Sequence, residues 1–165
     1  MSYIFDAYLP AHPLEGLLLA ARWQSADIDR ITRTVDWARQ HRVPVVLFGP
    51  VPEYDMPLPL LLAYSIAWKR PDMVGHHRIG ERESLDAELQ ELAASTWRVP
   101  YISLYKAICR DGECRVYSDT AQTVPLMFDD SHLSSEGSLV IGRQLVDKGH
   151  LRALSAGSGI MSKGS

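Results

Sequence analysis

The sequence predicts an α/β fold in which strands and helices alternate and the strands pair in parallel. Three short apolar runs have the character of buried strands, and amphipathic segments of helical period separate them. Short connections between alternating elements favour right-handed crossovers, which leave neighbouring strands parallel. The length of 165 residues is enough for one domain whose core removes roughly 70% of the unfolded chain's surface from water.

The three predicted strands are continuous apolar runs ended by turn residues. The first, "GLLLAA" at residues 16–21, lies between Pro13 and the polar residues after Trp23, and we expect it to be buried on both faces. The second covers residues 43–47 and is ended by Gly49 and Pro50. The third is "VPYISL" at residues 99–104. Each has the length of an ordinary strand.

Two amphipathic helices are predicted between these strands. The first follows Ser25, which can cap it, and its apolar residues recur at spacings of three, four and three: Ile28, Ile31, Val35 and Ala38. The second covers about residues 81–97, with one apolar face formed by Leu85, Leu89 and Leu92. Residues 57–80 are ambiguous, because "LPLLLAYSIAW" fits a short helix whereas the segment after it is broken by Pro71, Gly75 and Gly80.

A last helix is predicted from about Ser134 to Lys148. Ser134 or Ser135 can cap it, Gly149 can end it, and its inward residues are expected to be Leu139, Val140 and Leu145. Residues 151–165 are rich in Ser and Gly and are expected to form a disordered tail, so the domain is placed at residues 1–150.

Composition excludes several classes of function. The formal charge of -3 is too small to indicate a nucleic-acid partner, and no apolar run reaches the roughly 18 to 20 residues that cross a bilayer. The first residues also lack the features of a secretory signal.

Cys109 and Cys114 bracket the turn sequence "RDG", which fits either a local disulfide in an oxidising compartment or two free thiols in the cytosol.

The polar segment "FDDSHLSSEG" at residues 128–137 holds the main candidate site. Asp129 precedes His132 by three residues, a spacing that fits part of a nucleophilic hydrolase site, a pair of metal ligands or a polar helix entrance. In an open α/β sheet the functional crevice lies beyond the carboxyl ends of the strands, where this segment and "FGPVP" should both emerge. No metal site and no cofactor are expected, because no partner ligands occur at a recognised spacing.

Most of the chain resembles a known family. The segments "LLLAARW", "VPVVLFGPVP", the cysteine pair and "MFDDSHLSSEGSLVIGRQL" together resemble the C-terminal part of the SGNH hydrolase-like domain that is fused to membrane acyltransferases of the acyltransferase type three family. The resemblance covers about residues 13–150. It implies a three-layer α/β/α, flavodoxin-like fold, and acyl transfer to or from hydroxyl groups of cell-envelope glycans such as lipopolysaccharide or peptidoglycan.

The resemblance also implies roles for individual residues. His132 corresponds to the family's general base and Asp129 to the acid that orients it, while Cys109 and Cys114 would form a disulfide in a periplasmic or other extracytoplasmic compartment. Trp23 and Arg22 follow the first strand, where an aromatic face suits a sugar ring and a guanidinium suits a carboxylate. Core packing of Trp23 and a surface role of Arg22 are the alternatives.

One element of the family is missing from these 165 residues. The family's domains begin with a strand that ends in a Gly-Asp-Ser turn carrying the nucleophile, and the sequence contains no "GDS". We therefore expect an N-terminally truncated sheet and a chain that is nearly inactive alone. A noncatalytic glycan-binding or structural remnant is the alternative. The first strand would become an unprotected apolar edge, which predicts self-association.

Overall fold

The molecule contains a parallel sheet of three strands. The computed structural model describes residues 3–12 and 14–149, and its strands β1 (Leu17–Leu19), β2 (Val45–Phe48) and β3 (Tyr101–Ile102) pair in the order β1-β2-β3. Both pairings are parallel, with Leu18 opposite Val46 and Leu47 opposite Tyr101. The predicted α/β fold with a parallel sheet is confirmed.

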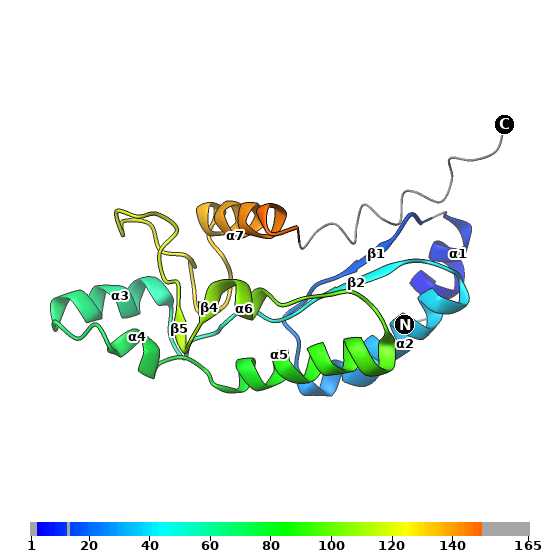
Figure 1. The fold of residues 1–165 in the computed structure, drawn as a ribbon, viewed down its shortest axis with the longest axis horizontal. Helices are drawn as coiled ribbons and strands as arrows, with labels where there is room; N and C mark the ends of the chain where they lie inside the picture. Colours follow the sequence, from blue (N-terminus) through cyan, green and yellow to red (C-terminus); the bar gives the residue numbers. More distant parts are fainter. Residues whose placement is uncertain (1–2, 13, 150–165) are drawn as a thin grey trace.

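Helices cover both faces of this sheet. On one face lie α2 (Ile28–Gln40) and α5 (Glu81–Leu92), the latter continuing into the π-helical turn η3 (Ala93–Trp97), whereas α7 (Ser135–Asp147) lies on the other face (Figure 1). The alternation of side chains along a strand explains this arrangement. Val45 and Leu47 pack in the cluster with α2 and α5, while Val46 packs in the cluster with α7.

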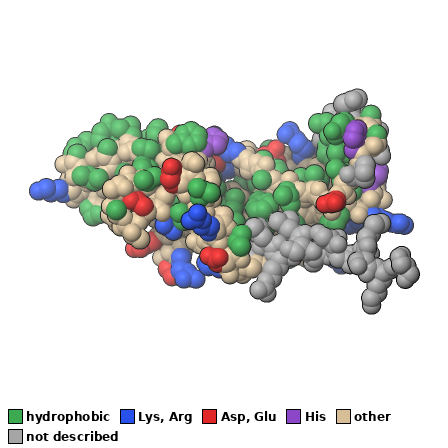
Figure 2. All heavy atoms as spheres, turned by 90° about the horizontal axis from the view of Figure 1, so that it is seen from above, with side chains coloured by type: hydrophobic (Ala, Val, Ile, Leu, Met, Phe, Trp, Pro, Cys, Tyr) green, Lys and Arg blue, Asp and Glu red, His purple; other side chains and the backbone are tan. Residues whose placement is uncertain are grey.

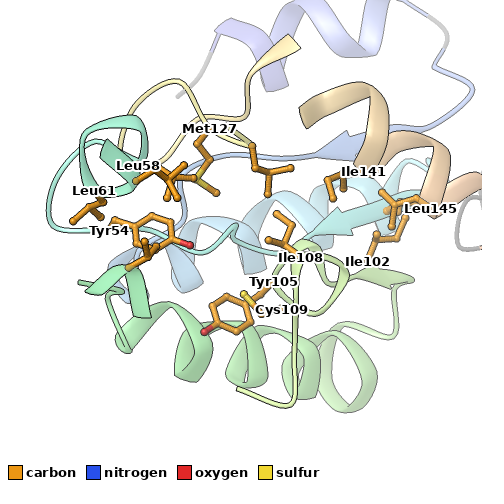
Figure 3. Close-up of a cluster of buried hydrophobic side chains, with 14 residues drawn as sticks. Tyr54, Leu58, Leu61, Ile102, Tyr105, Ile108, Cys109, Met127, Ile141 and Leu145 are labelled. Carbon is orange, nitrogen blue, oxygen red and sulfur yellow. The ribbon is translucent and has the colours of Figure 1, made fainter. Parts of the chain in front are cut away.

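The second of these clusters joins the sheet to the rest of the chain. It includes residues of β2, β3, α7 and the helix α3 (Leu58–Ala67), and Figure 3 shows Ile141 and Leu145 of α7 beside Ile102. The same cluster takes in Leu126 and Met127, which directly precede the candidate site segment and are fully buried. Burial of these two residues therefore ties the site segment to the core.

Short elements complete the described part of the chain. They are η1 (Tyr3–Tyr8), α1 (Leu9–Ala11), η2 (Ser25–Asp27), α4 (Met73–His76), α6 (Leu104–Ile108), β4 (Cys109–Arg110) and β5 (Glu113–Cys114).

The ambiguous segment after Pro57 is helical as α3, and its apolar residues continue around the helix, so Leu60, Ile66 and Trp68 are exposed. Figure 2 shows hydrophobic side chains gathered over the end of the molecule that α3 forms.

The expectation that the first strand is buried on both faces is wrong. β1 has three residues instead of six, and Leu18 is 56% exposed. Leu17 and Leu19 face the cluster with α2 and α5, but the cluster on the opposite face contains no residue of β1. The apolar run therefore forms an edge strand with one covered face, and Leu18 projects from the other.

Three local predictions also need correction. Ser25 does not cap α2; Gln24 and Asp27 form a capping box around the turn η2 that leads into it. The third strand is limited to Tyr101–Ile102, because Ser103 caps α6. Leu139 is 58% exposed rather than inward.

The last helix otherwise matches its prediction. Ser134 caps α7 by accepting a hydrogen bond from the amide of Gly137, and Gly149 follows the helix with a φ of 70°. The inward positions recur every four residues at Gly137, Ile141 and Leu145.

Among the described residues no helix is both long and apolar enough to span a membrane. The predicted tail at residues 151–165 and the domain boundary at 150 lie outside the described residues.

Candidate active site

The carboxyl ends of β1 and β2 open into a cavity of about 520 Å³. Its lining includes Ala20, Ala21 and Arg22, which follow β1, and Gly49 and Pro50, which follow β2. Four residues of the candidate site segment also line the cavity: Phe128, Ser131, His132 and Leu133. The cavity thus lies where the topology of an open α/β sheet places a ligand crevice.

Asp129 and His132 are in direct contact in this segment. The Oδ2 atom of Asp129 lies 2.8 Å from Nδ1 of His132, and Oδ1 accepts hydrogen bonds from the backbone amides of Ser131 at 2.9 Å and of His132 at 2.7 Å. A carboxylate on Nδ1 keeps the proton on that nitrogen and leaves Nε2 as the basic one. The pair therefore has the geometry of a base and its orienting acid.

Backbone hydrogen bonds hold this segment against Tyr54 and Leu58 of the same chain. The carbonyl of Asp129 accepts from the amide of Leu58, and the carbonyl of Asp130 accepts from the amide of Tyr54, each at 3.0 Å. The amide of Phe128 donates to the carbonyl of His132 at 3.1 Å. The conformation that joins the two side chains is thus fixed by contacts with residues more than 70 positions earlier as well as by its own turn.

The hydrogen bonds around Asp129 lower the pKa of its carboxyl group. Partial burial acts in the opposite direction, because it disfavours the charged form, but the amides of Ser131 and His132 and the imidazole together outweigh it. Asp129 is therefore ionised at neutral pH and can accept the Nδ1 proton of His132.

Glu53 is a residue of this site that the sequence reasoning missed. It is 1% exposed, lines the cavity and accepts hydrogen bonds from Nε and Nη2 of Arg22 at 3.1 and 2.6 Å. Nη1 of Arg82 lies 3.5 Å from its other oxygen. Hydrogen bonding to Glu53 raises the pKa of Arg22. The only sequence signal was an acidic residue within a Pro-rich apolar stretch, which does not identify a partner.

Arg22 lies between Glu53 and the segment of the catalytic candidates. Its Nη2 atom is 3.9 Å from Oδ2 of Asp130, and its side chain is 52% exposed. The structure thus brings Arg22 to the same cavity as His132. Ion pairs here join two arginines and two carboxylates, so their charges balance: Arg22, Arg82, Glu53 and Asp130.

The side chain of Trp23 packs against the core, whereas that of Arg22 lines the cavity. Its indole Nε1 donates to the carbonyl of Phe48 at 2.7 Å, its ring packs against the cluster with α2 and α5, and its own carbonyl accepts from Arg82. Trp23 does not line the cavity. These contacts correspond to a packing role that holds the end of β1 beside the end of β2.

No described hydroxyl group donates to Nε2 of His132. Ser131 reaches the other ring nitrogen, Nδ1, at 3.3 Å, and Ser138 of α7 lines the cavity but makes no hydrogen bond to the imidazole. His76 and His77 do not line this cavity; they pair with Asp72 and Asp55, respectively. Among residues 3–12 and 14–149, no group of three or more potential metal ligands is present.

Cys109 and Cys114 form a disulfide across the hairpin of β4 and β5. Arg78 holds this hairpin from the side by donating to the carbonyl of Gly112 and to Sγ of Cys114. Of the two alternatives that the spacing left open, the structure contains the disulfide.

Comparison with known proteins defines the class. The model of the family described as "SGNH domain (fused to AT3 domains)" matches residues 4–147, and the chain belongs to this family. Among solved structures, the periplasmic domain of a lipopolysaccharide acetyltransferase from Salmonella ser. Paratyphi A is similar, with a TM-score of 0.64 and 20% identity. The alignment covers 80% of this chain and 55% of that one, and it shows a shared fold. No curated protein matches the sequence significantly.

Proposed function

We propose that this domain takes part in SGNH-type acyl transfer or ester hydrolysis on cell-envelope carbohydrates. The observation that carries the proposal is the 2.8 Å contact between Asp129 and Nδ1 of His132 over the carboxyl ends of a parallel sheet. Family membership and the acetyltransferase named among the similar structures support the same chemistry. An O-acetyl group on a glycan hydroxyl is the proposed substrate class.

In this reaction His132 would act as the general base. Its Nε2 takes the proton of an attacking hydroxyl as the oxygen bonds to the acyl carbon, and returns it to the leaving alcohol. Asp129 holds the other ring proton and stabilises the imidazolium that forms. The family's Gly-Asp-Ser block does not occur in the 165 residues. We therefore expect the turnover rate of this polypeptide alone to be several powers of ten below that of a domain with the nucleophilic serine.

We further propose an extracytoplasmic location and a role beside a membrane acyltransferase domain. The family is described as fused to AT3 domains, and the similar structure is a periplasmic domain. A disulfide between Cys109 and Cys114 persists in an oxidising compartment. The proposed partners are a glycan and an acyl donor.

A fluorophosphonate probe tests the catalytic proposal. We expect no labelling of the chain alone, and labelling of the serine in a synthetic peptide that carries an apolar strand with a Gly-Asp-Ser turn once the chain is added. The variants His132→Ala and Asp129→Asn should abolish or strongly reduce this labelling. Labelling that is equally strong with His132→Ala would refute the assignment of the base.

A noncatalytic glycan-binding domain on the same fold is the second candidate. The observation that favours it is that, among the described residues, no hydroxyl donates to Nε2 of His132. Glycan binding without peptide labelling would support this candidate over the first.

A further inference from the structure

Phe128 is an exposed aromatic residue at the edge of the cavity. Its relative exposure is 63%, although the two residues before it, Leu126 and Met127, are fully buried. Tyr8 and Trp68 are other exposed aromatic residues, but neither lines the cavity that contains His132. An exposed aromatic ring beside a candidate base is a candidate ligand contact.

The position of the Phe128 ring is well defined. Its backbone amide donates to the carbonyl of His132 at 3.1 Å, and Met127 pairs with Leu133 across the same segment. The phenyl ring stacks on the imidazole of His132 with centroids 5.7 Å apart and an angle of 16° between the planes. The aromatic surface is therefore presented in a fixed relation to the imidazole.

The cavity is larger than a short acyl group requires. Its volume of about 520 Å³ falls within the range of sites for small molecules, and six apolar residues form much of its wall: Ala20, Ala21, Pro50, Val51, Leu104 and Leu133. An acetyl group has only three heavy atoms. The remaining space suits the sugar ring that carries the reacting hydroxyl.

We propose that Phe128 is the stacking surface for this sugar ring and determines which glycan binds. The electron-rich face of an aromatic ring attracts the weakly positive C–H groups on the flat side of a pyranose. A sugar ring in contact with Phe128 would lie in the cavity that His132 also lines. This inference rests on the proposed glycan chemistry and adds the residue that selects the ring.

Titration with methyl glycosides of neutral hexoses, monitored by the side-chain NMR signals of His132, tests the inference. We expect Phe128→Ala to raise the Kd about tenfold, which corresponds to about 1.4 kcal/mol. Phe128→Trp should retain binding, and Phe128→Leu should weaken it about as much as Phe128→Ala does, because leucine keeps apolar area but lacks the aromatic face. Trp68→Ala removes an exposed aromatic residue outside the cavity and should leave the Kd unchanged.

The outcomes separate this inference from the proposed function. Equal Kd values for the wild type, Phe128→Ala and Phe128→Leu would overturn the role of Phe128 while leaving glycan binding intact. Weaker binding of methyl acetate but not of glycosides in Phe128→Ala would also overturn it, because Phe128 would then contact the acyl group. Absence of glycoside binding by the wild type would overturn both proposals. The signals of His132 in the variants report whether the segment keeps its fold.

Discussion

At the scale of single residues, Asp129 has two functions in the same short segment. One oxygen accepts two backbone amides and so shapes the turn, and the other contacts the imidazole of His132. The proposed orientation of the His132 imidazole and the local folding of the turn therefore depend on the same carboxylate. A substitution of Asp129 affects both properties. The pH dependence of the free energy of unfolding reports the contribution of its charge to folding.

The lowered pKa of Asp129 predicts how stability changes with pH. Because the folded state favours the charged carboxylate, the stabilisation is present above the ordinary Asp pKa of about 3.9 and is lost as the pH falls through the lower folded value. Asp129→Asn should cost on the order of 1 kcal/mol at pH 7. Urea unfolding at pH 7 and pH 3 should show the difference between the two proteins shrinking at pH 3. A difference that grows at pH 3 would contradict the sign of the pKa shift.

Gly49 is a second residue whose identity the structure explains. A Cβ atom at this position would clash with the hydroxyl of Tyr101 and with the carboxylate of Asp86, which are hydrogen-bonded to each other at 2.8 Å. Burial raises the pKa of Asp86, and hydrogen bonds from Ser103 and Tyr101 oppose this effect. Gly49 thus leaves room for the hydrogen-bonded pair of Tyr101 and Asp86 next to a residue that lines the cavity.

Gly49→Ala should destabilise the domain by about 1–3 kcal/mol, because the cluster must shift to admit the methyl group. Gly142→Ala in α7 is the matched control, since a Cβ atom there meets no atom within 4 Å. Alanine in a helix should stabilise the control variant by about 0.5–1 kcal/mol. Chemical denaturation measures both changes, and equal effects of the two substitutions would argue against the steric explanation.

At the scale of elements, β1 is the part of the fold most exposed to other chains. It pairs only with β2 among the described strands, and Leu18 projects from its uncovered face. Apolar edge strands without a charged side chain favour pairing between chains. We therefore expect self-association through β1 at high protein concentration.

Leu18→Lys should reduce this self-association without lowering stability, because the side chain is already largely exposed. Leu139→Lys in α7 is the control, since Leu139 has a similar exposure of 58% and lies outside the sheet. Light scattering across a concentration series gives the mass of each variant. A wild-type chain that stays monomeric throughout the series would refute the prediction.

The disulfide stabilises a second element, the hairpin of β4 and β5. It closes a short loop, with the cysteines five positions apart, and replacing both by serine should cost about 2 kcal/mol. Unfolding of the wild type with and without dithiothreitol should give a similar difference. The double variant should not respond to the reductant, and a reductant-insensitive wild type would show that the bridge contributes nothing to stability.

At the scale of the whole molecule, Glu53 connects segments that are distant in the sequence. It joins Arg22 after β1 to Arg82 of α5, and its backbone carbonyl accepts from the amide of Ile79. The side-chain Nε of Arg82 is buried without a hydrogen-bond partner among the described residues. Loss of the Glu53 charge would leave Arg82 buried without its carboxylate.

Glu53→Gln should therefore cost about 2–3 kcal/mol, somewhat below the usual range for a buried ion pair because Arg22 is half exposed. Asp72→Asn is the control, since it breaks an exposed pair with Arg70 and should change stability little. Thermal and urea unfolding test both variants. Similar small effects would show that burial does not strengthen the Glu53 pairs.

The sequence by itself determined the α/β class and the main candidate pair. Periodic apolar residues define α2, α5 and α7 because helix period and local caps depend on near neighbours. The Asp129 and His132 side chains meet because a turn of three residues brings them together. A family resemblance carried by that segment added the expected chemistry.

Only the tertiary structure decided what surrounds this pair. Arg22 and Glu53 are 31 positions apart, and no local rule relates a carboxylate to a guanidinium at that distance. The exposure of Leu18 and of Phe128 likewise depends on which elements cover each face, and helix or strand periodicity does not contain that information. Packing of distant segments, which depends on the fold of the whole chain, placed the ion pairs and the aromatic ring around His132.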